Sequence, residues 1–329
     1  MKRRSTVTDV AAAAGVGAST VSRFLRGVTV RPEVAKRIAK AVAQLNYEPD
    51  ETARALRGGR SRTIGVVFPK VSNVFFSQAL QLIGESARKR GYTVVLLTHE
   101  DSLEQQNKDL LTLRRYRAEG VILAAAPGTT LQSVRSALPT LPVVAFDSFF
   151  TPEIESILLQ NRQAARTATK HLIDHGYKSI ACVYAKPNIF SYQERSAGYA
   201  DAMTAHGLTP TFLTAEDYSE LELQLRNQFA KKKRPDALLV LSDFGALTVL
   251  RILGESDEDV KRPYMVAFDD FECAALLATS LTVIRQPIAR MMEITVNALF
   301  RQIDGDSTTE NRTVSIPGEL IIRRSCGCP

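Results

Sequence analysis

From Thr63 onward, short apolar runs alternate with amphipathic stretches of helical period, and this alternation restricts the fold more than any other feature of the chain. The apolar runs are typical of buried strands and cover 64–68, 93–97, 121–124, 143–146, 179–184, 237–241, 264–268 and 282–285. The amphipathic stretches cover 75–90, 103–117, 162–175, 193–206, 219–231 and 287–303. Repetition of strand and helix predicts parallel sheets covered by helices on both faces. Ligands of such sheets bind beyond the carboxyl ends of the strands.

The first 60 residues carry all of the net charge. They contain 12 Lys or Arg and 5 Asp or Glu, which gives a formal charge of +7, equal to that of the whole 329-residue chain. The rest of the chain is therefore neutral. A basic segment joined to a neutral body indicates a nucleic-acid-binding module attached to further domains.

Targeting signals are not evident in the sequence. Thr8 and Asp9 interrupt the apolar residues near the N-terminus, and no apolar run approaches the length of a membrane span. We expect a cytoplasmic protein that has no contact with membranes.

The cysteines and histidines give no recognisable metal pattern. Cys182, Cys273, Cys326 and Cys328 lack the paired spacing of structural zinc sites, so we expect reduced structural cysteines, with the 326–328 tail open to redox or metal chemistry. His171 and His175 lie one helical turn apart but have no HExxH motif or third ligand in the sequence. We predict no metal site and no cofactor.

The basic segment reads as a helix-turn-helix. Thr6 and Asp9 resemble a capping box that opens a short helix, Gly15 breaks it, and a second helix is expected from about Ala18 to Leu25. A third helix, with Pro32 near its first position, closes a small core. In this geometry the second helix enters the major groove. The residues predicted to bind DNA are Thr6, Ala18, Ser19, Thr20, Ser22, Arg23 and Arg26, and Arg23 is the candidate for bidentate contact with guanine. A small helical cap is the alternative.

The segment 47–60 predicts a hinge. Ala53 and Leu56 share one face of a helix too short to be stable alone. We expect it to fold when two copies pack on each other and on DNA, with Ala53, Arg54 and Leu56 at the contact and Leu56 inserted in the minor groove. A flexible linker is the alternative.

These residues resemble the lactose-repressor (LacI/GalR) family. Its motifs match Asp9, Val10, Ala11, Ala14, Gly15, Val16, Thr20, Val21, Ser22, Arg23, Leu25, Gly27, Pro49, Ala53, Arg54 and Leu56. Gly17, Arg26, Arg31 and Asp50 depart from the usual family residues, which affects the identity of the operator rather than binding itself. Family landmarks such as PVVAFD, ERSAGYADAM and IIRRSCG continue the resemblance over the full length.

The resemblance implies a small all-α helix-turn-helix head and an α/β, periplasmic-binding-protein-like core of two parallel-sheet subdomains. The expected divisions are 1–46 for the DNA-binding domain, 47–60 for the hinge and 61–329 for the core. Within the core, the N-subdomain takes about 61–160 and 288–316, and the C-subdomain about 161–287 and 317–329.

The resemblance also implies an effector in the cleft between the subdomains. The matching positions are Phe75, Asp147, Phe149, Arg195, Tyr218, Asp269 and Gln286. Aromatic faces with an Arg and an Asp suit a sugar or a sugar acid. Ile189 occupies the position at which purine-sensing members have an Arg, and this difference disfavours a purine effector. As alternatives, Phe75 belongs to the core and Arg195 forms only an ion pair with Asp269.

The sequence thus predicts a regulator, most simply a repressor, of double-stranded operator DNA with a pseudo-palindromic site. We expect no catalytic residues, because no dinucleotide-binding or nucleophile-elbow motif occurs. The alternative is a transport-type solute-binding protein, for which a basic DNA-reading head has no purpose. The sequence ends at Pro329 without a heptad segment, so we expect a homodimer rather than a tetramer.

Overall fold

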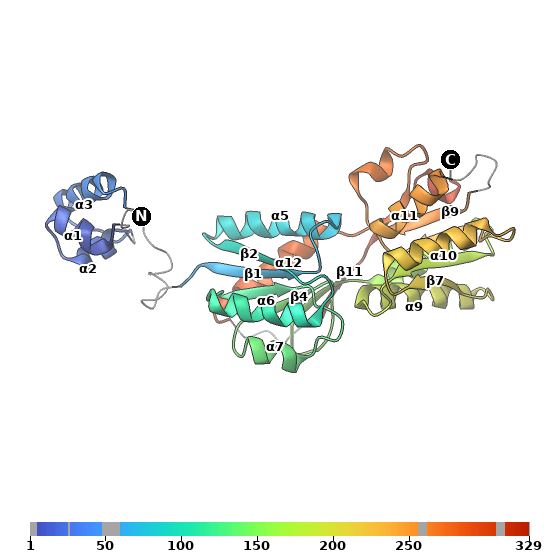
Figure 1. The fold of residues 1–329 in the computed structure, drawn as a ribbon, viewed down its shortest axis with the longest axis horizontal. Helices are drawn as coiled ribbons and strands as arrows, with labels where there is room; N and C mark the ends of the chain where they lie inside the picture. The colour runs from blue at the N-terminus through green and yellow to red at the C-terminus, as the bar shows by residue number, and fades with distance from the viewer. Residues whose placement is uncertain (1–4, 26, 48–59, 256–261, 307–312, 329) are drawn as a thin grey trace. The chain divides into compact units, whose positions relative to one another are not determined.

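A computed structural model describes residues 5–25, 27–47, 60–255, 262–306 and 313–328. The chain divides into two compact units between Ser61 and Arg62. Figure 1 shows the smaller unit as a group of helices and the larger unit as two sheets flanked by helices. Within the described residues, no helix combines the length and the hydropathy that crossing a bilayer requires.

The smaller unit is a helical head formed by α1 (Val7–Ala14), α2 (Ala18–Leu25) and α3 (Pro32–Gln44). The predicted capping box is present, since Thr6 Oγ1 accepts from the Asp9 N–H at 3.3 Å and the Asp9 carboxylate accepts from the Thr6 N–H at 2.8 Å. Gly15 ends α1 in the left-handed conformation, with φ of 62°. Local signals in the sequence therefore set the ends of these helices.

The core of the head contains one large apolar side chain from each helix. Val10, Val21 and Ile38 are fully buried against one another, and Ala14 rather than Ala13 completes the buried face of α1. This packing fixes α2 against α1 and α3 and leaves the opposite face of α2 exposed.

The first lobe of the larger unit is a sheet with strand order β11-β5-β4-β3-β1-β2, in which neighbouring strands are parallel. Its strands are β1 (Thr63–Phe68), β2 (Thr93–Thr98), β3 (Gly120–Leu123), β4 (Val143–Phe146), β5 (Ser156–Leu159) and β11 (Thr313–Ile316). Helices α5 (Val74–Lys89) and α12 (Ile288–Ile303) pack on the face to which Val66 points. Helices α6 (Leu103–Arg115) and α7 (Leu131–Ala137) cover the face of Val67.

The second lobe repeats this arrangement with strand order β12-β10-β9-β8-β6-β7. Its strands are β6 (Ile180–Ala185), β7 (Thr211–Ala215), β8 (Ala237–Val240), β9 (Tyr264–Phe268), β10 (Thr282–Arg285) and β12 (Glu319–Ile321). Helices α8 (Asn161–Asp174) and α9 (Phe190–Ala205) cover one face, and α10 (Tyr218–Ala230) and α11 (Asp243–Gly254) cover the other. Gly198 lets α9 approach α8, because a Cβ there would lie 2.1 Å from the Arg162 carbonyl oxygen.

The fold class agrees with the sequence prediction, with one difference in strand direction. Strand β12 runs antiparallel to β10, whereas the other neighbouring pairs are parallel. It enters the second sheet from β11 of the first lobe, and therefore from the end at which β10 leaves that sheet, so that Glu319 pairs with Arg285. An antiparallel edge strand on a parallel sheet is a common solution.

The strands that the sequence analysis did not identify are β5, β7, β11 and β12. Strands β7 and β11 lie at sheet edges and alternate or expose their side chains, so they lack a continuous apolar run. Helices α7 and α11 were also not identified, and α11 carries Asp243 into the site described below.

Candidate functional site

A cavity of about 200 Å³ lies between the two lobes, at the carboxyl ends of their strands. Six of the seven residues predicted to bind an effector line it, namely Phe75, Asp147, Arg195, Tyr218, Asp269 and Gln286. Five of them lie at strand ends or helix N-termini, which is where parallel sheets place their ligands, and Arg195 lies in the second turn of α9. A second hollow of about 250 Å³ shares Phe75, Asp269 and Gln286 with this cavity.

Phe149 is the predicted residue that is not among the cavity-lining residues. Its side chain is 36% exposed, and its ring centroid lies 6.1 Å from that of Phe190, the first residue of α9. The structure therefore places Phe149 in an aromatic contact between the lobes rather than on the cavity wall.

Arg195 is held rigidly in the cavity wall and is 2% exposed. Its Nε donates to Asn161 Oδ1 at 2.7 Å, its Nη1 donates to the Leu241 carbonyl at 2.7 Å, and the guanidinium lies 4.2 Å from the Phe268 ring centroid. Within the described residues, no hydrogen bond is formed by Nη2 and no ion pair joins Arg195 to Asp269. The charged group therefore retains a donor for a ligand.

Asp147 and Asp269 contribute a carboxylate from each lobe. Both follow a strand directly and have positive φ angles of 53° and 74°. Asp269 Oδ1 accepts from Gln286 Nε2 at 2.6 Å. Within the described part of the chain, the buried Asp147 Oδ1 has no hydrogen-bond partner, and burial raises the pKa of Asp147 to about 7, with Arg195 acting in the opposite direction.

The two aromatic residues of the cavity differ in how they are held. Phe75 stacks on Phe146 at 5.2 Å and is 4% exposed, so most of its ring belongs to the core and only an edge reaches the cavity. The Tyr218 hydroxyl lies 3.2 Å from both Tyr192 Oη and Ser242 Oγ. Burial raises the pKa of Tyr218, so this hydroxyl stays protonated and can donate.

Polar contacts join the lobes across the cavity at four residues that are not among the predicted effector-binding positions. Asn73 Nδ2 donates to Asp243 Oδ1 at 3.1 Å, and Lys186 pairs with Asp101. Burial, with the nearby charge of Asp269 as a second cause, raises the pKa of Asp243 to about 6. Asp243 lies two residues after the buried run 237–241, and this position after a strand end is the signal that could have identified it.

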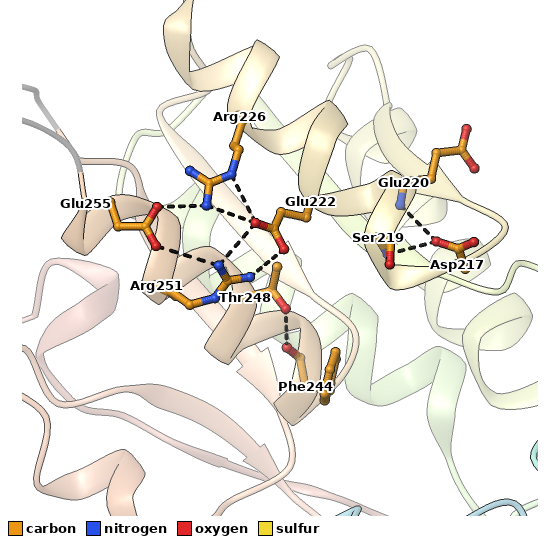
Figure 2. Close-up of polar contacts among 9 residues, drawn as sticks. All are labelled: Asp217, Ser219, Glu220, Glu222, Arg226, Phe244, Thr248, Arg251 and Glu255. Carbon is orange, nitrogen blue, oxygen red and sulfur yellow. Dashed lines mark hydrogen bonds and ion pairs between the residues drawn. The ribbon is translucent and has the colours of Figure 1, made fainter.

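An ion-pair network fixes the helices that bring Tyr218 and Asp243 to the cavity. Glu222 of α10 bonds to Arg226 at 2.9 Å and to Arg251 of α11, and Arg226 pairs with Glu255 at 2.7 Å, as Figure 2 shows. The hydrogen bonds from Arg251 and Arg226 lower the pKa of Glu222 to about 2. These contacts hold α10 and α11 together, and Tyr218 and Asp243 are their first residues.

The helical head presents its predicted contact residues mainly from α2. Ala18, Ser19 and Arg23 are exposed, and Thr20 and Ser22 are half-buried. Ser19 and Arg23 lie one turn apart on the same face. Thr6 is exposed as the cap of α1, while Arg26, Ala53, Arg54 and Leu56 lie outside the described residues.

Comparison with known proteins agrees with both units. Residues 61–324 match the family described as "Periplasmic binding proteins and sugar binding domain of LacI family", and residues 6–50 match "Bacterial regulatory proteins, lacI family". The chain is 28% identical to the ribose operon repressor of Halalkalibacterium halodurans, over 98% of this chain and 97% of that protein.

Solved structures show the same relationship. A lac repressor dimer bound to operator and the anti-inducer ONPF has a TM-score of 0.85 and 25% identity, and the alignment covers 98% of this chain and 99% of that one. A periplasmic binding protein/LacI transcriptional regulator from Alkaliphilus metalliredigens QYMF, complexed with D-xylulofuranose, has a TM-score of 0.71 and 26% identity, covering 80% and 98% of the two chains. The chain therefore belongs to the LacI family of bacterial transcriptional regulators.

Proposed function

We propose that this protein is a homodimeric transcriptional repressor whose affinity for a pseudo-palindromic operator is switched by a sugar or sugar acid in the cavity between the lobes. Residues 1–46 bind DNA, 47–60 form the hinge and 61–329 form the effector-binding and dimerisation core. The N-subdomain comprises about 61–160 and 288–316, and the C-subdomain about 161–287 and 317–329. The protein acts in the cytoplasm and catalyses no reaction.

The polar atoms that line the cavity indicate the chemical class of the effector. Asp147 Oδ1 and Gln286 Oε1 are buried acceptors to which none of the described residues donates, and buried acceptors of this kind are costly unless an O–H or N–H reaches them. Arg195 Nη2 supplies a charged donor to the same cavity. A ligand with several hydroxyl groups, or with hydroxyls and one carboxylate, satisfies all three groups together.

The contacts between the lobes support a mechanism for switching. Asn73 to Asp243 and Lys186 to Asp101 already join the two sides of the cavity, and a ligand that bonds to Asp147 and Arg195 adds a further connection. Effector binding then changes how far the lobes close, and through this the spacing at which two hinges meet. Coupling of this kind is typically about 1 to 3 kcal/mol.

The effector is tested with a thermal-shift screen of neutral sugars, sugar acids and purines on the full chain, followed by calorimetry. A sugar or sugar acid should raise the melting temperature and alter operator affinity in an anisotropy titration. Stabilisation by purines alone would refute the effector class while leaving the DNA-binding role intact.

The DNA-binding role is tested by selecting operators from a random duplex library and comparing Arg23→Ala with Lys40→Ala, an exposed position of α3. Arg23→Ala should lose about 1 to 3 kcal/mol of affinity and relax base preference at one position in each half-site. An equal loss on every sequence would show that Arg23 contacts only phosphate. Failure to select any sequence would refute the repressor assignment.

A further inference from the structure

The fold brings together two parts of the chain that are far apart in the sequence and that the function above does not use. One is the end of α8, with His171 in its last turn and His175 directly after it. The other is the C-terminal segment that contains Cys326 and Cys328. The ligand atoms of His171, Cys326 and Cys328 all lie within 4.8 Å of one another. His175 Nε2 lies 3.0 Å from Cys328 Sγ, and His171 Nε2 lies 3.9 Å from it.

We propose that these side chains form a zinc site of two histidines and two cysteines. In tetrahedral zinc sites, Zn–S bonds of about 2.3 Å and Zn–N bonds of about 2.0 to 2.1 Å place nitrogen and sulfur about 3.6 Å apart. The two nitrogen–sulfur distances here, 3.0 and 3.9 Å, lie on either side of that value.

The imidazole of His175 is oriented for metal binding. Its Nδ1 lies 2.8 Å from the His171 carbonyl oxygen, and because a carbonyl only accepts, Nδ1 must carry the proton. The neutral ring then presents the lone pair of Nε2 to Cys328 Sγ. A second ring nitrogen bonded to a backbone carbonyl is the usual arrangement for a histidine that ligates zinc.

Cys326 is held by contacts of its own. Its Sγ lies 3.1 Å from Thr282 Oγ1, whose single proton can go to this sulfur or to the Arg323 carbonyl oxygen at 2.9 Å, and Tyr177 Oη donates to the Cys326 carbonyl at 3.1 Å. Gly327 has a φ of 93°, and a Cβ at this position would lie 2.4 Å from Tyr177 Oη. Glycine between the cysteines therefore permits the turn that brings Cys326 Sγ and Cys328 Sγ within 4.8 Å of each other and of the His171 ring nitrogen.

Hard divalent cations do not suit this donor set, because imidazole and thiolate select zinc over magnesium or calcium. None of the four proposed ligands is among the residues that line the effector cavity. A structural cation would bind the C-terminal segment to α8, the helix whose first residue, Asn161, accepts a hydrogen bond from Arg195.

The experiment uses the full chain, reduced, stripped with chelator and titrated with zinc against a chromophoric competitor. Cobalt titrated in parallel reports thiolate ligation through a sulfur-to-cobalt charge-transfer band. Cys328→Ser and His171→Gln remove ligands at half-buried positions, and Cys273→Ser changes an exposed cysteine that lies outside the cluster. Circular dichroism confirms that each variant is folded.

We expect one equivalent of zinc in the parent protein and in Cys273→Ser, with the charge-transfer band in both. Loss of a supporting contact alone weakens zinc sites about 10- to 100-fold, so each ligand variant should weaken zinc by at least about 100-fold. The proposal would be overturned if the parent bound no more zinc than the ligand variants do, or if it bound cobalt without the thiolate charge-transfer band. It would also be overturned if Cys326 and Cys328 formed a disulfide in the presence of excess zinc, which a loss of two hydrogens in the protein mass would show.

Discussion

Asp147 and Asp269 occupy equivalent positions in the two lobes, each directly after the third strand in its sheet order, β4 and β9. Both line the same cavity and both have positive φ angles. Asp269 accepts from Gln286 at 2.6 Å, whereas Asp147 Oδ1 is buried and has no hydrogen-bond partner among the residues that the structure describes. The repeated topology therefore places two carboxylates in the cavity, and the neighbouring side chains give only Asp269 such a contact within this part of the chain.

Removing Arg195, which lies near Asp147, should have the largest effect. Arg195→Ala should weaken effector binding about 100-fold, or about 3 kcal/mol, because it removes a buried charged donor. Arg195→Lys should recover part of this loss, since it keeps the charge but not the planar fork. Calorimetry measures the affinity, and Arg166→Ala, an exposed residue of α8 that does not line the cavity, is the control. Undiminished affinity in Arg195→Ala would exclude it as a ligand.

Truncating the two aspartates should separate their roles in stability. Asp269→Ala leaves Gln286 Nε2 without its acceptor and should lower the free energy of unfolding by about 1 to 3 kcal/mol. Asp147→Ala removes an unpartnered acceptor, so the effector-free protein should be as stable as the parent or more stable. Denaturant titrations of both variants without effector measure this difference. Equal destabilisation would contradict the distinction between the two carboxylates.

The same comparison predicts a dependence of stability on pH. Since burial raises the pKa of Asp147 to about 7, the folded state keeps this proton while the unfolded chain releases it near its ordinary pKa of 3.8. The parent should therefore lose stability relative to Asp147→Asn as pH rises from about 4 to about 7, by at most about 1.4 kcal/mol per pH unit. Denaturant titrations across this range test the sign. If the difference in free energy of unfolding between the two proteins did not change with pH, the Asp147 carboxylate would lie in a more solvated environment than the structure shows.

The smallest effect is expected from the contact between the lobes at Asn73. Asn73→Ser keeps an oxygen that can cap α5 at Phe75 but removes the Nδ2 donor to Asp243. Effector affinity should fall only a few-fold, which corresponds to less than about 1 kcal/mol. Ser77→Ala, on the same helix, is the control for helix stability. Unchanged affinity would show that this contact does not help to hold the lobes together when effector binds.

Much of the site could be predicted because its residues follow buried strands. Asp147, Asp269 and Gln286 come directly after apolar runs that the sequence identifies, and Arg195 and Tyr218 match family positions. Asp243 carries the same signal, two residues after a buried run, whereas the roles of Asn73 and Lys186 depend on contacts between the lobes. Asn73 and Asp243, for example, are separated by 170 residues.

The helix-turn-helix, its capping box and the alternation of strands and helices follow from the sequence alone, because they depend on local spacing, capping and burial periodicity. Long-range packing is what gives Asp269 a partner but leaves Asp147 Oδ1 with none among the described residues, and what brings His175 to Cys328 across 153 residues. Partners of this kind follow from the packing of distant elements. Local patterns specify the elements, whereas the contacts that give a side chain its chemistry arise when those elements meet.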